Sequence, residues 1–377
     1  MDPPPPEGPP ASEVAATLEA VLADFALAAV RGPADAPLPV IEWAPPDAER
    51  AERAERARPA AVERLGLTQR SARGFATVVA VMELLHERAA AGPAAGPCME
   101  RELYYRLKEA DASLKDAGVA TRLKEADVSR GVQKISRMLH VPREDLGVQC
   151  SGGKGLVHGK LTVWSDGTWT SCNLPDTPFV IGGDLHQIAR MQFQTAARYV
   201  LVVEKETVFR RAVAERLDRT LPCLVVTAKG YPDHATRAFV HRLHAAFPRL
   251  KIFGLCDYNP HGVAILSTFR WGYVKEASDA AWWGPRHAFP LAWLGVHAAD
   301  VGRLPAGQAC TGRDRSLLKT LAADSPVAGD PAWAREVAAM AAGGLKYEIE
   351  DVCALYPNFL EFIVPRLLEA AHAQGGW

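Results

Sequence analysis

The sequence predicts a mixed α/β protein, with a helical N-terminal part followed by a domain built on a parallel sheet. The main observation lies in residues 199–271, where three short runs of β-branched residues and leucine each give way to a stretch with helical periodicity. Strands that alternate with helices in this way are typical of βα units on a parallel sheet. A second observation is that residues 75–139 contain three helical patterns in succession.

A polar residue follows each predicted strand. The strands are Tyr199 to Val203, Cys223 to Thr227 and Ile252 to Cys256, and the polar residues are Glu204, Lys229 and Asp257. We expect all three at the carboxyl edge of the sheet, where open α/β sheets bind their ligands. Two carboxylates at this edge suit Mg²⁺, held partly by water and by substrate phosphate. The alternative is that acidic residues follow strands because loops are solvated and helix N-termini favour negative charge.

Three motifs in this stretch occur together: V-E-K-E-x-x-F at Val203 to Phe209, G-x-P-D-x-x-T-R at Gly230 to Arg237, and D-x-N-P-H-G at Asp257 to Gly262. In combination they resemble the Toprim domain of topoisomerase VI A subunits and of their eukaryotic relatives, the meiotic DNA double-strand-break transesterases. The resemblance implies that Glu204, Asp257 and Asn259 hold Mg²⁺. Lys229 and Arg237 are candidate phosphate contacts, although Arg237 is also spaced to pair with Asp233.

Asn259 stands where the family usually has Asp. An amide oxygen ligates Mg²⁺ without adding charge, so we expect a lower metal affinity. Asn before Pro260 is also a favourable helix N-cap followed by Pro at the first helical position. Both roles are compatible, and the sequence favours the cap first.

Residues 1–60 are expected to be a disordered Pro/Ala-rich region that contains one amphipathic helix, Glu13 to Val30. That helix either packs on its own domain or docks a partner. Residues 61–175 are assigned to a DNA-binding domain that carries the catalytic tyrosine, and residues 176–377 to the Toprim domain with its C-terminal elaboration. Within the latter, AFPLAWLGVHAADV, with Asp300, and GGLKYEIEDV resemble later elements of the family.

Three helices are expected in the N-terminal domain: from Phe75 to a stop at Gly92 and Pro93, along MERELYYRLKEA, and along VSRGVQKISRMLHV. The third places apolar residues on one face and Arg130, Lys134 and Arg137 around the other. The segments GVQC and LVHGKLTVW, joined by SGGKG, predict a β-hairpin. Three helices and a hairpin predict a winged-helix domain whose third helix enters the major groove of DNA.

The second of these helices matches the family motif R-[DE]-[IVL]-[YF]-Y at Arg101 to Tyr105. The resemblance implies that Tyr105 is the nucleophile, whereas Tyr104 is expected to pack. Arg101 precedes Tyr105 by four residues, so both lie on one helical face, where the guanidinium can neutralise a scissile phosphate. The repeat of RLKEAD at Arg106 to Asp111 and Arg122 to Asp127 predicts a lengthened loop between the nucleophile and the third helix.

Composition restricts the remaining possibilities. The formal net charge is −1, so any DNA-binding surface must be local. The seven cysteines lack zinc or disulfide spacing, and no run is long and apolar enough to predict a membrane span. GGKGLVHGKL lacks the pattern of a nucleotide-binding P-loop, so nucleotide hydrolysis, if needed, belongs to another protein of the complex.

These features predict a DNA transesterase that makes double-strand breaks through a 5′-phosphotyrosyl intermediate. By resemblance it acts in the nucleus at the start of meiotic recombination, as a homodimer on double-stranded DNA, with an accessory or ATPase-type B subunit. The alternative within the family is the A subunit of topoisomerase VI. A Toprim-type hydrolytic nuclease would use the same acidic edge of the sheet, that of Glu204 and Asp257, without Tyr105. A DNA-binding scaffold would keep the fold with weak metal affinity.

Overall fold

The computed structural model describes residues 10–31, 40–43, 63–66, 72–92, 96, 98–116, 123–139, 141, 143, 145–149, 153–174, 177–272, 287–304 and 307–373. The described residues before Gly153 form one compact unit, and those from Gly153 onward form a second. No helix in the described ranges has the length and apolar character needed to cross a bilayer.

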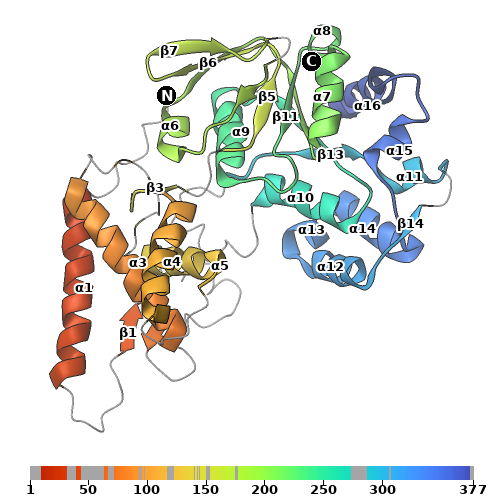
Figure 1. The fold of residues 1–377 in the computed structure, drawn as a ribbon. Coiled ribbons are helices and arrows are strands. Elements are labelled where there is room, and N and C mark those ends of the chain that lie inside the picture. Colours follow the sequence, from red (N-terminus) through yellow and green to blue (C-terminus); the bar gives the residue numbers. More distant parts are fainter. Residues whose placement is uncertain are drawn as a thin grey trace. The chain divides into compact units, whose positions relative to one another are not determined.

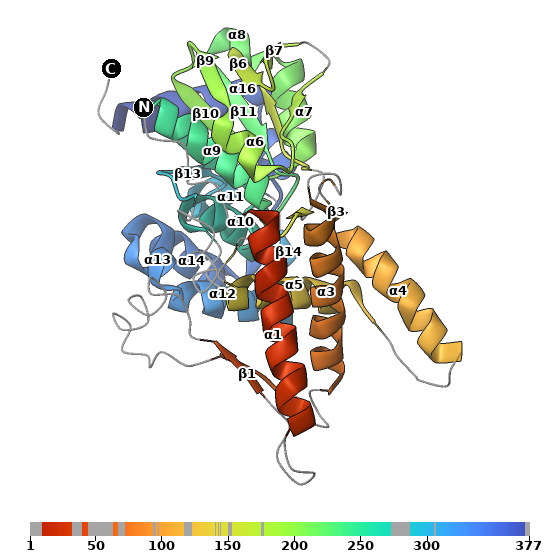
Figure 2. The ribbon, with the colours of Figure 1, turned by 90° about the vertical axis from the view of Figure 1, so that its left-hand side faces the viewer.

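The first unit is a bundle of helices, shown in red to yellow in Figure 1. Its helices are α1 (Ala11–Arg31), α3 (Ala72–Ala91), α4 (Glu100–Asp116) and α5 (Glu125–Leu139). They share a buried apolar core that includes Val14, Leu18, Val81, Met82, Leu85, Leu103, Val132 and Ile135. Helix α1 lies along α3 in Figures 1 and 2, and Val14 and Leu18 are buried in this core. Of the two roles expected for this helix, packing on its own unit is therefore the one observed.

The prediction of a β-hairpin around SGGKG is wrong. Strand β4 (Val148–Gln149) pairs in parallel with β3 (Cys98–Met99), next to the start of α4. Strand β5 (Leu156–His158) instead pairs with a strand of the second unit. The three expected helices are present, but without this hairpin the winged-helix assignment stays a prediction. Strand β1 (Val40–Trp43), paired with β2 (Glu63–Gly66), also lies within the region expected to lack structure.

The second unit is built on a six-stranded mixed sheet of order β13-β12-β10-β11-β5-β8. Its strands are β13 (Ala292–Gly295), β12 (Lys251–Leu255), β10 (Tyr199–Val203), β11 (Cys223–Thr227), β5 and β8 (Phe179–Val180). The first four are mutually parallel, with Tyr199 paired with both Lys251 and Cys223. The parallel sheet expected from the three hydrophobic runs is confirmed, and β5 and β8 extend it with antiparallel pairs.

Helices connect these strands and cover both faces of the sheet. Helix α7 (Glu206–Ala214) lies in the connection from β10 to β11. Helix α9 (His234–Ala246) connects β11 to β12, and α10 (Pro260–Trp271) follows β12 on the way to β13. These two connections cross the sheet in the direction opposite to that of α7. Because such crossovers are right-handed, α9 and α10 lie on the face opposite α7 (Figure 1). Helix α16 (Phe359–Ala373) packs beside α7 and β13.

Shorter elements complete this unit. A three-stranded sheet contains β7 (Thr168–Ser171), β6 (Leu161–Ser165) and β9 (Gln192–Thr195), next to α6 (Leu185–Arg190), and α8 (Leu217–Thr220) precedes β11. The C-terminal half adds α11 (Ala298–Val301), β14 (Gln308–Ala309), α12 (Gly312–Ala323), α13 (Ser325–Gly329), α14 (Pro331–Gly343), β15 (Leu345–Lys346) and α15 (Ile349–Cys353).

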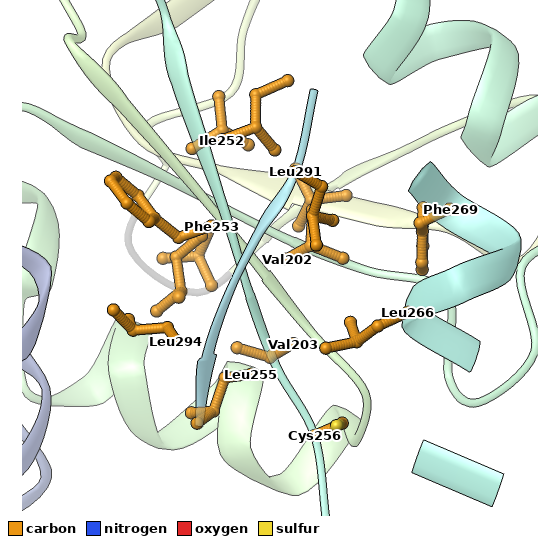
Figure 3. Close-up of a cluster of buried hydrophobic side chains, with 14 of the residues drawn as sticks. Val202, Val203, Ile252, Phe253, Leu255, Cys256, Leu266, Phe269, Leu291 and Leu294 are labelled. Carbon is orange, nitrogen blue, oxygen red and sulfur yellow. The ribbon is translucent and has the colours of Figure 1, made fainter. Parts of the chain in front are cut away.

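The core between the sheet and α10 depends on a glycine in the middle of β12. Figure 3 shows Leu266 and Phe269 of α10 facing Val202 of β10 and Leu291, the residue before β13. A Cβ atom on Gly254 would lie 2.8 Å from side-chain carbons of both Leu266 and Leu291. The missing side chain therefore lets α10 pack closely on the sheet, which fixes the helix that begins at the acidic edge.

Substituting Gly254→Ala is expected to destabilise this unit by about 1–3 kcal/mol, since the added methyl group overpacks a closed core. Thermal unfolding followed by circular dichroism measures the effect. Gly343→Ala is the matched control, because its Cβ meets nothing within 4 Å and the glycine has no left-handed φ. A midpoint for Gly254→Ala equal to that of the control would contradict this account of the packing.

Candidate functional site

Two carboxyl groups meet at the carboxyl edge of the large sheet. Glu204 follows β10 and Asp257 follows the adjacent strand β12. The Asp257 backbone N–H donates to Glu204 Oε2 over 3.0 Å, and the Ile349 N–H donates to Asp257 Oδ1 over 2.9 Å. Asp257 is only 4% exposed. The strand register thus brings the two acids together at this edge, as the sequence predicted, with Asp257 buried and Glu204 partly buried.

Lys205 is the cation of this edge, and sequence reasoning missed it. Its Nζ lies 3.1 Å from Asp257 Oδ1 and 2.8 Å from carboxylate oxygens of both Glu348 and Glu350. Burial acts to lower the pKa of Lys205, but its hydrogen bonds to Glu348 and Glu350 and the charge of Asp257 outweigh burial and raise the pKa above its usual range. The lysine therefore stays charged and ties α15 to the acidic edge.

The protonation of the two acids reflects their burial. Burial, and next the nearby charge of Asp257, raise the pKa of Glu204 to about 7, against the lowering effects of the Asp257 N–H and of Lys205. Burial also raises the pKa of Asp257, although its hydrogen bond from Ile349 and the charge of Lys205 oppose this shift. Around Lys205, the carboxyl groups of Asp257, Glu348 and Glu350 thus outnumber the one ammonium group that pairs with them.

Asn259 caps helix α10. Its Oδ1 accepts the Gly262 N–H over 2.8 Å, Pro260 takes the first turn, and Nδ2 lies 3.4 Å from Asp257 Oδ2. The cap expected from the sequence is therefore present. Because Oδ1 accepts the helix N–H, the amide nitrogen is the side-chain atom of Asn259 that lies next to the Asp257 carboxylate.

Gly262, the last residue of the D-x-N-P-H-G motif, is required by close approach. A Cβ at this position would lie 2.5 Å from the Asp257 carbonyl oxygen and 3.1 Å from Glu204 Oε2. Since the first of these atoms belongs to the backbone, a side chain would displace the acidic edge itself. The structure thus gives a steric reason why this motif position is occupied by glycine, which the sequence alone did not reveal.

His261 is a second residue that sequence reasoning missed at this edge. Its ring is half exposed, with Nδ1 3.3 Å from the Tyr231 hydroxyl and Nε2 3.9 Å from Asp314 Oδ1. A hydrogen bond from the Thr311 backbone, helped by those from the Thr311 hydroxyl and from Lys346, lowers the pKa of Asp314 to about 2. The signal for His261 was present in the motif, but its partners lie far away in the chain.

The two candidate phosphate contacts differ in exposure. Lys229 is about one-third exposed, and its Nζ lies 3.4 Å from Glu206 Oε2. Arg237 is only 3% exposed, with its guanidinium 3.2 Å from the His234 ring. Asp233 uses its side chain to cap α9 at the Thr236 N–H. Arg237 is thus covered in the isolated chain, and the phosphate-contact roles of both residues stay predictions.

The two tyrosines of α4 have different environments. Tyr105 is 48% exposed, whereas Tyr104 packs against the apolar core of the first unit. The Arg101 guanidinium lies 5.9 Å from the centre of the Tyr105 ring, and Arg101 Nε is 3.8 Å from a carboxylate oxygen of Glu125. The helix therefore presents Tyr105 to solvent next to a cation and turns Tyr104 inward.

Helix α5 presents cationic side chains opposite its buried face. Val132 and Ile135 are fully buried, whereas Arg130 and Lys134 are exposed and Arg137 is half-buried. Arg130 pairs with Asp127 on the same helix. The amphipathic pattern predicted for this helix is present, and the DNA-binding role of the three cations stays a prediction.

The acidic edge suits Mg²⁺ as a site of few protein ligands. The described part of the chain holds no cluster of three or more His, Cys, Asp or Glu side chains arranged to hold a metal ion. Mg²⁺ commonly takes one or two carboxylates and completes its shell with water and phosphate oxygens. Glu204 and Asp257 fit this pattern, because the two carboxyl groups lie at the ends of adjacent strands, with the Asp257 N–H 3.0 Å from Glu204 Oε2.

Comparison with known proteins agrees with this geometry. Residues 199–367 match the family model of the Toprim domain shared by Spo11 and the A subunit of topoisomerase 6. The chain is 31% identical to meiotic recombination protein SPO11-2 of Oryza sativa subsp. japonica, over 94% of this chain and 90% of that protein. The chain belongs to the Spo11/topoisomerase 6A family. The Toprim match covers Glu204, Asp257 and Asn259, and the similarity to the rice protein extends far into the N-terminal unit.

Other relatives come from both branches of the Spo11/topoisomerase 6A family. Meiotic recombination protein SPO11 of Homo sapiens is 27% identical over 82% of this chain and 73% of that protein. The A3 subunit of DNA topoisomerase 6 from Oryza sativa subsp. indica is 31% identical over 62% of this chain and 53% of that protein. Family membership makes this chain a DNA-cleaving enzyme related to topoisomerases, whose Toprim domain is of a kind that generally binds Mg²⁺.

Burial of Glu204 predicts a pH-dependent stability in metal-free buffer. Because its folded pKa of about 7 is above the unfolded value of 4.5, the stabilising protonated form is fully present below the unfolded pKa and is lost as the pH rises through about 7. Between about pH 5 and about pH 8, the wild type should lose up to about 3 kcal/mol relative to Glu204→Gln, which keeps a side-chain oxygen for the Asp257 N–H.

Urea unfolding in EDTA, followed by tryptophan fluorescence, measures this difference, since Trp293 and Trp333 pack in the second unit. Comparison with the Gln variant cancels the titration of all other groups. A constant difference between the two proteins across this pH range would show that Glu204 is not buried as described.

Proposed function

We propose that this chain is a DNA transesterase that makes double-strand breaks to initiate meiotic recombination, with Tyr105 as nucleophile. The observation that carries the proposal is the contrast on α4, where Tyr105 is exposed beside Arg101 while Tyr104 packs inward. A nucleophile must reach a phosphorus atom of DNA, and of the two tyrosines on α4 it is Tyr105 that is exposed. The names of the relatives add support, since the similar proteins of rice and human described above are named meiotic recombination proteins.

In the proposed reaction, Tyr105 Oη attacks a backbone phosphorus atom. The bond from phosphorus to Oη forms and the bond to the 3′ oxygen breaks, leaving a 5′-phosphotyrosyl link and a 3′ hydroxyl that takes up a proton. One phosphodiester bond of the DNA is exchanged for one phosphotyrosyl bond, so no water or nucleotide is consumed. Arg101 offsets negative charge on the phosphate during attack, because its guanidinium already lies over the tyrosine ring.

The acidic edge holds the DNA strand for this attack. Glu204 and Asp257 would hold Mg²⁺, which when bound supplies positive charge next to a phosphate oxygen. Asn259 is assigned to the same edge, where its Oδ1 also accepts the Gly262 N–H that caps α10. Lys205 positions Asp257 and is itself held by Glu348 and Glu350. Lys229 and Arg237 are assigned to the DNA phosphates at this edge, and Arg130, Lys134 and Arg137 to the DNA held by the N-terminal unit.

The active site is proposed to be shared between two chains of a homodimer. Tyr105 belongs to the first compact unit and the acidic edge to the second. A twofold arrangement suits a DNA duplex, since its two strands are related by local dyads and both must be cut. By the resemblance, each chain offers its tyrosine to the acidic edge of the other, in the nucleus and with an accessory or ATPase-type B subunit.

A topoisomerase role is the second candidate. The similarity to the A3 subunit of DNA topoisomerase 6 supports it, over 62% of this chain. The chemistry would be that of a type IIB topoisomerase, an isomerase, with religation of the break and a separate ATPase subunit. Conversion of a supercoiled plasmid into a relaxed and religated circle, in the presence of ATP and a B subunit, distinguishes this role from net break formation.

Substituting Tyr105→Phe is expected to abolish the covalent link between protein and DNA 5′ ends and to leave DNA affinity within about twofold, since only one hydroxyl is removed. Denaturant-resistant protein on labelled 5′ ends measures the link, and a gel-shift assay measures binding. Tyr104→Phe is the matched control, with an expected cost in packing only. A covalent adduct that survives in Tyr105→Phe would refute the assignment, and cleavage without any adduct would indicate a hydrolytic nuclease instead.

A further inference from the structure

A cavity of about 940 Å³ lies at the opposite end of the strands that carry the acidic edge. Its lining includes Arg198 and Tyr199 at the start of β10, Lys251 at the start of β12, and Ala292 at the start of β13. In Figure 3 two lining residues, Ile252 and Leu291, lie at the upper end of the view, whereas Cys256, next to Asp257, lies at the lower end. The cavity is therefore separate from the site proposed for cleavage.

The lining of this cavity is cationic. It contains Arg198, Arg249, Lys251, Arg270, His244 and His372, and it contains no Asp or Glu. Burial, and next the neighbouring His241, lower the pKa of His244. The positive charge therefore comes from Arg198, Arg249 and Lys251, since Asp330 offsets that of Arg270. Such a collection stands out in a chain whose formal net charge is −1, and it favours an anion.

Two of the cations are held in place by the fold. Arg270 pairs with Asp330 over 2.9 Å and stacks 4.6 Å from the centre of the Trp271 ring. Lys251 Nζ donates to the Ala371 carbonyl oxygen over 2.6 Å. Arg249, in contrast, is exposed and forms no ion pair with any residue that the structure describes. The cavity thus combines preorganised cations with an arginine available to a ligand.

The remaining walls are apolar. Tyr199, Leu250, Ile252 and Leu291 are buried, and Leu368 is 39% exposed. A ligand that fits such walls has an anionic group beside a flat or apolar body. A nucleotide meets both requirements, because guanidinium groups pair with phosphate oxygens and a base packs on apolar and aromatic side chains.

We propose that this cavity is a nucleotide-binding site, with the phosphate next to Arg249 and the base against the apolar walls. The nucleotide comes either from solution or from an unpaired nucleotide of a DNA strand. It is not part of the segment being cut, since the five residues of β10 place it roughly 15 Å from the acidic edge. The inference goes beyond the proposed function, which uses only Tyr105 and that edge.

The test measures binding of two probes to the full chain in EDTA, so that no metal ion contributes. One probe is dAMP, followed by isothermal titration, with deoxyadenosine as the comparison that lacks phosphate. The other is a single-stranded octathymidylate with a 5′ phosphate and a 3′ fluorophore, followed by anisotropy. Binding of dAMP identifies a free nucleotide as sufficient. Binding of the oligonucleotide alone identifies a DNA strand as the source only if Arg249→Glu weakens it, because the DNA surface proposed above also binds a strand.

Arg249→Glu is expected to weaken binding of whichever probe binds by tenfold or more, because it replaces the phosphate partner with a carboxylate. Leu368→Asn should weaken it severalfold through loss of an apolar wall. Arg335→Glu on α14 is the matched control: it makes the same charge change at an exposed arginine outside the cavity and should leave affinity within twofold. The proposal is overturned if neither probe binds at millimolar concentration, if deoxyadenosine binds as well as dAMP, or if Arg249→Glu and Arg335→Glu have equal effects.

Discussion

The burial of two carboxyl groups side by side, those of Glu204 and Asp257, is the constraint on which much of the second unit depends. Parallel pairing of β10 with β12 brings them together. Lys205 and the Ile349 N–H stabilise Asp257, and Lys205 in turn ties down Glu348 and Glu350. The C-terminal α15 is therefore part of the acidic edge, although it lies far from Asp257 in the chain. The local excess of negative charge is the reason for proposing that this edge holds a cation.

The proposed chemistry divides two conflicting requirements between the two units. A charged carboxylate that is shielded from water attracts a metal ion more strongly, because a low dielectric strengthens the attraction. A nucleophile that attacks a large polymer must be exposed, as Tyr105 is. Placing the tyrosine on a helix of one unit and the acids on a sheet of the other meets both requirements. In the proposed homodimer, activity then depends on bringing the first unit of one chain and the second unit of the other together on DNA.

Local patterns predicted those features whose causes are local. The hydrophobic runs predicted β10, β11 and β12, and the Asn259 cap followed from its place before Pro260. Failures came from contacts distant in sequence. Strand β5 pairs with β11 instead of a neighbouring strand, and Lys205 is paired with residues more than 140 positions away. Lys205 is part of the V-E-K-E-x-x-F motif, but nothing in that motif indicates that its partners are Glu348 and Glu350.

The claim that Tyr105 and the acidic edge form one site shared by two chains is tested most directly by mixing inactive variants. Tyr105→Phe and Glu204→Ala chains should each fail to cleave alone. A heterodimer of the two, isolated through different affinity tags, holds one intact composite site. It should nick a single strand, with the DNA attached to the Glu204→Ala chain, which keeps its tyrosine. Verified heterodimers that neither nick DNA nor carry an adduct would contradict the account.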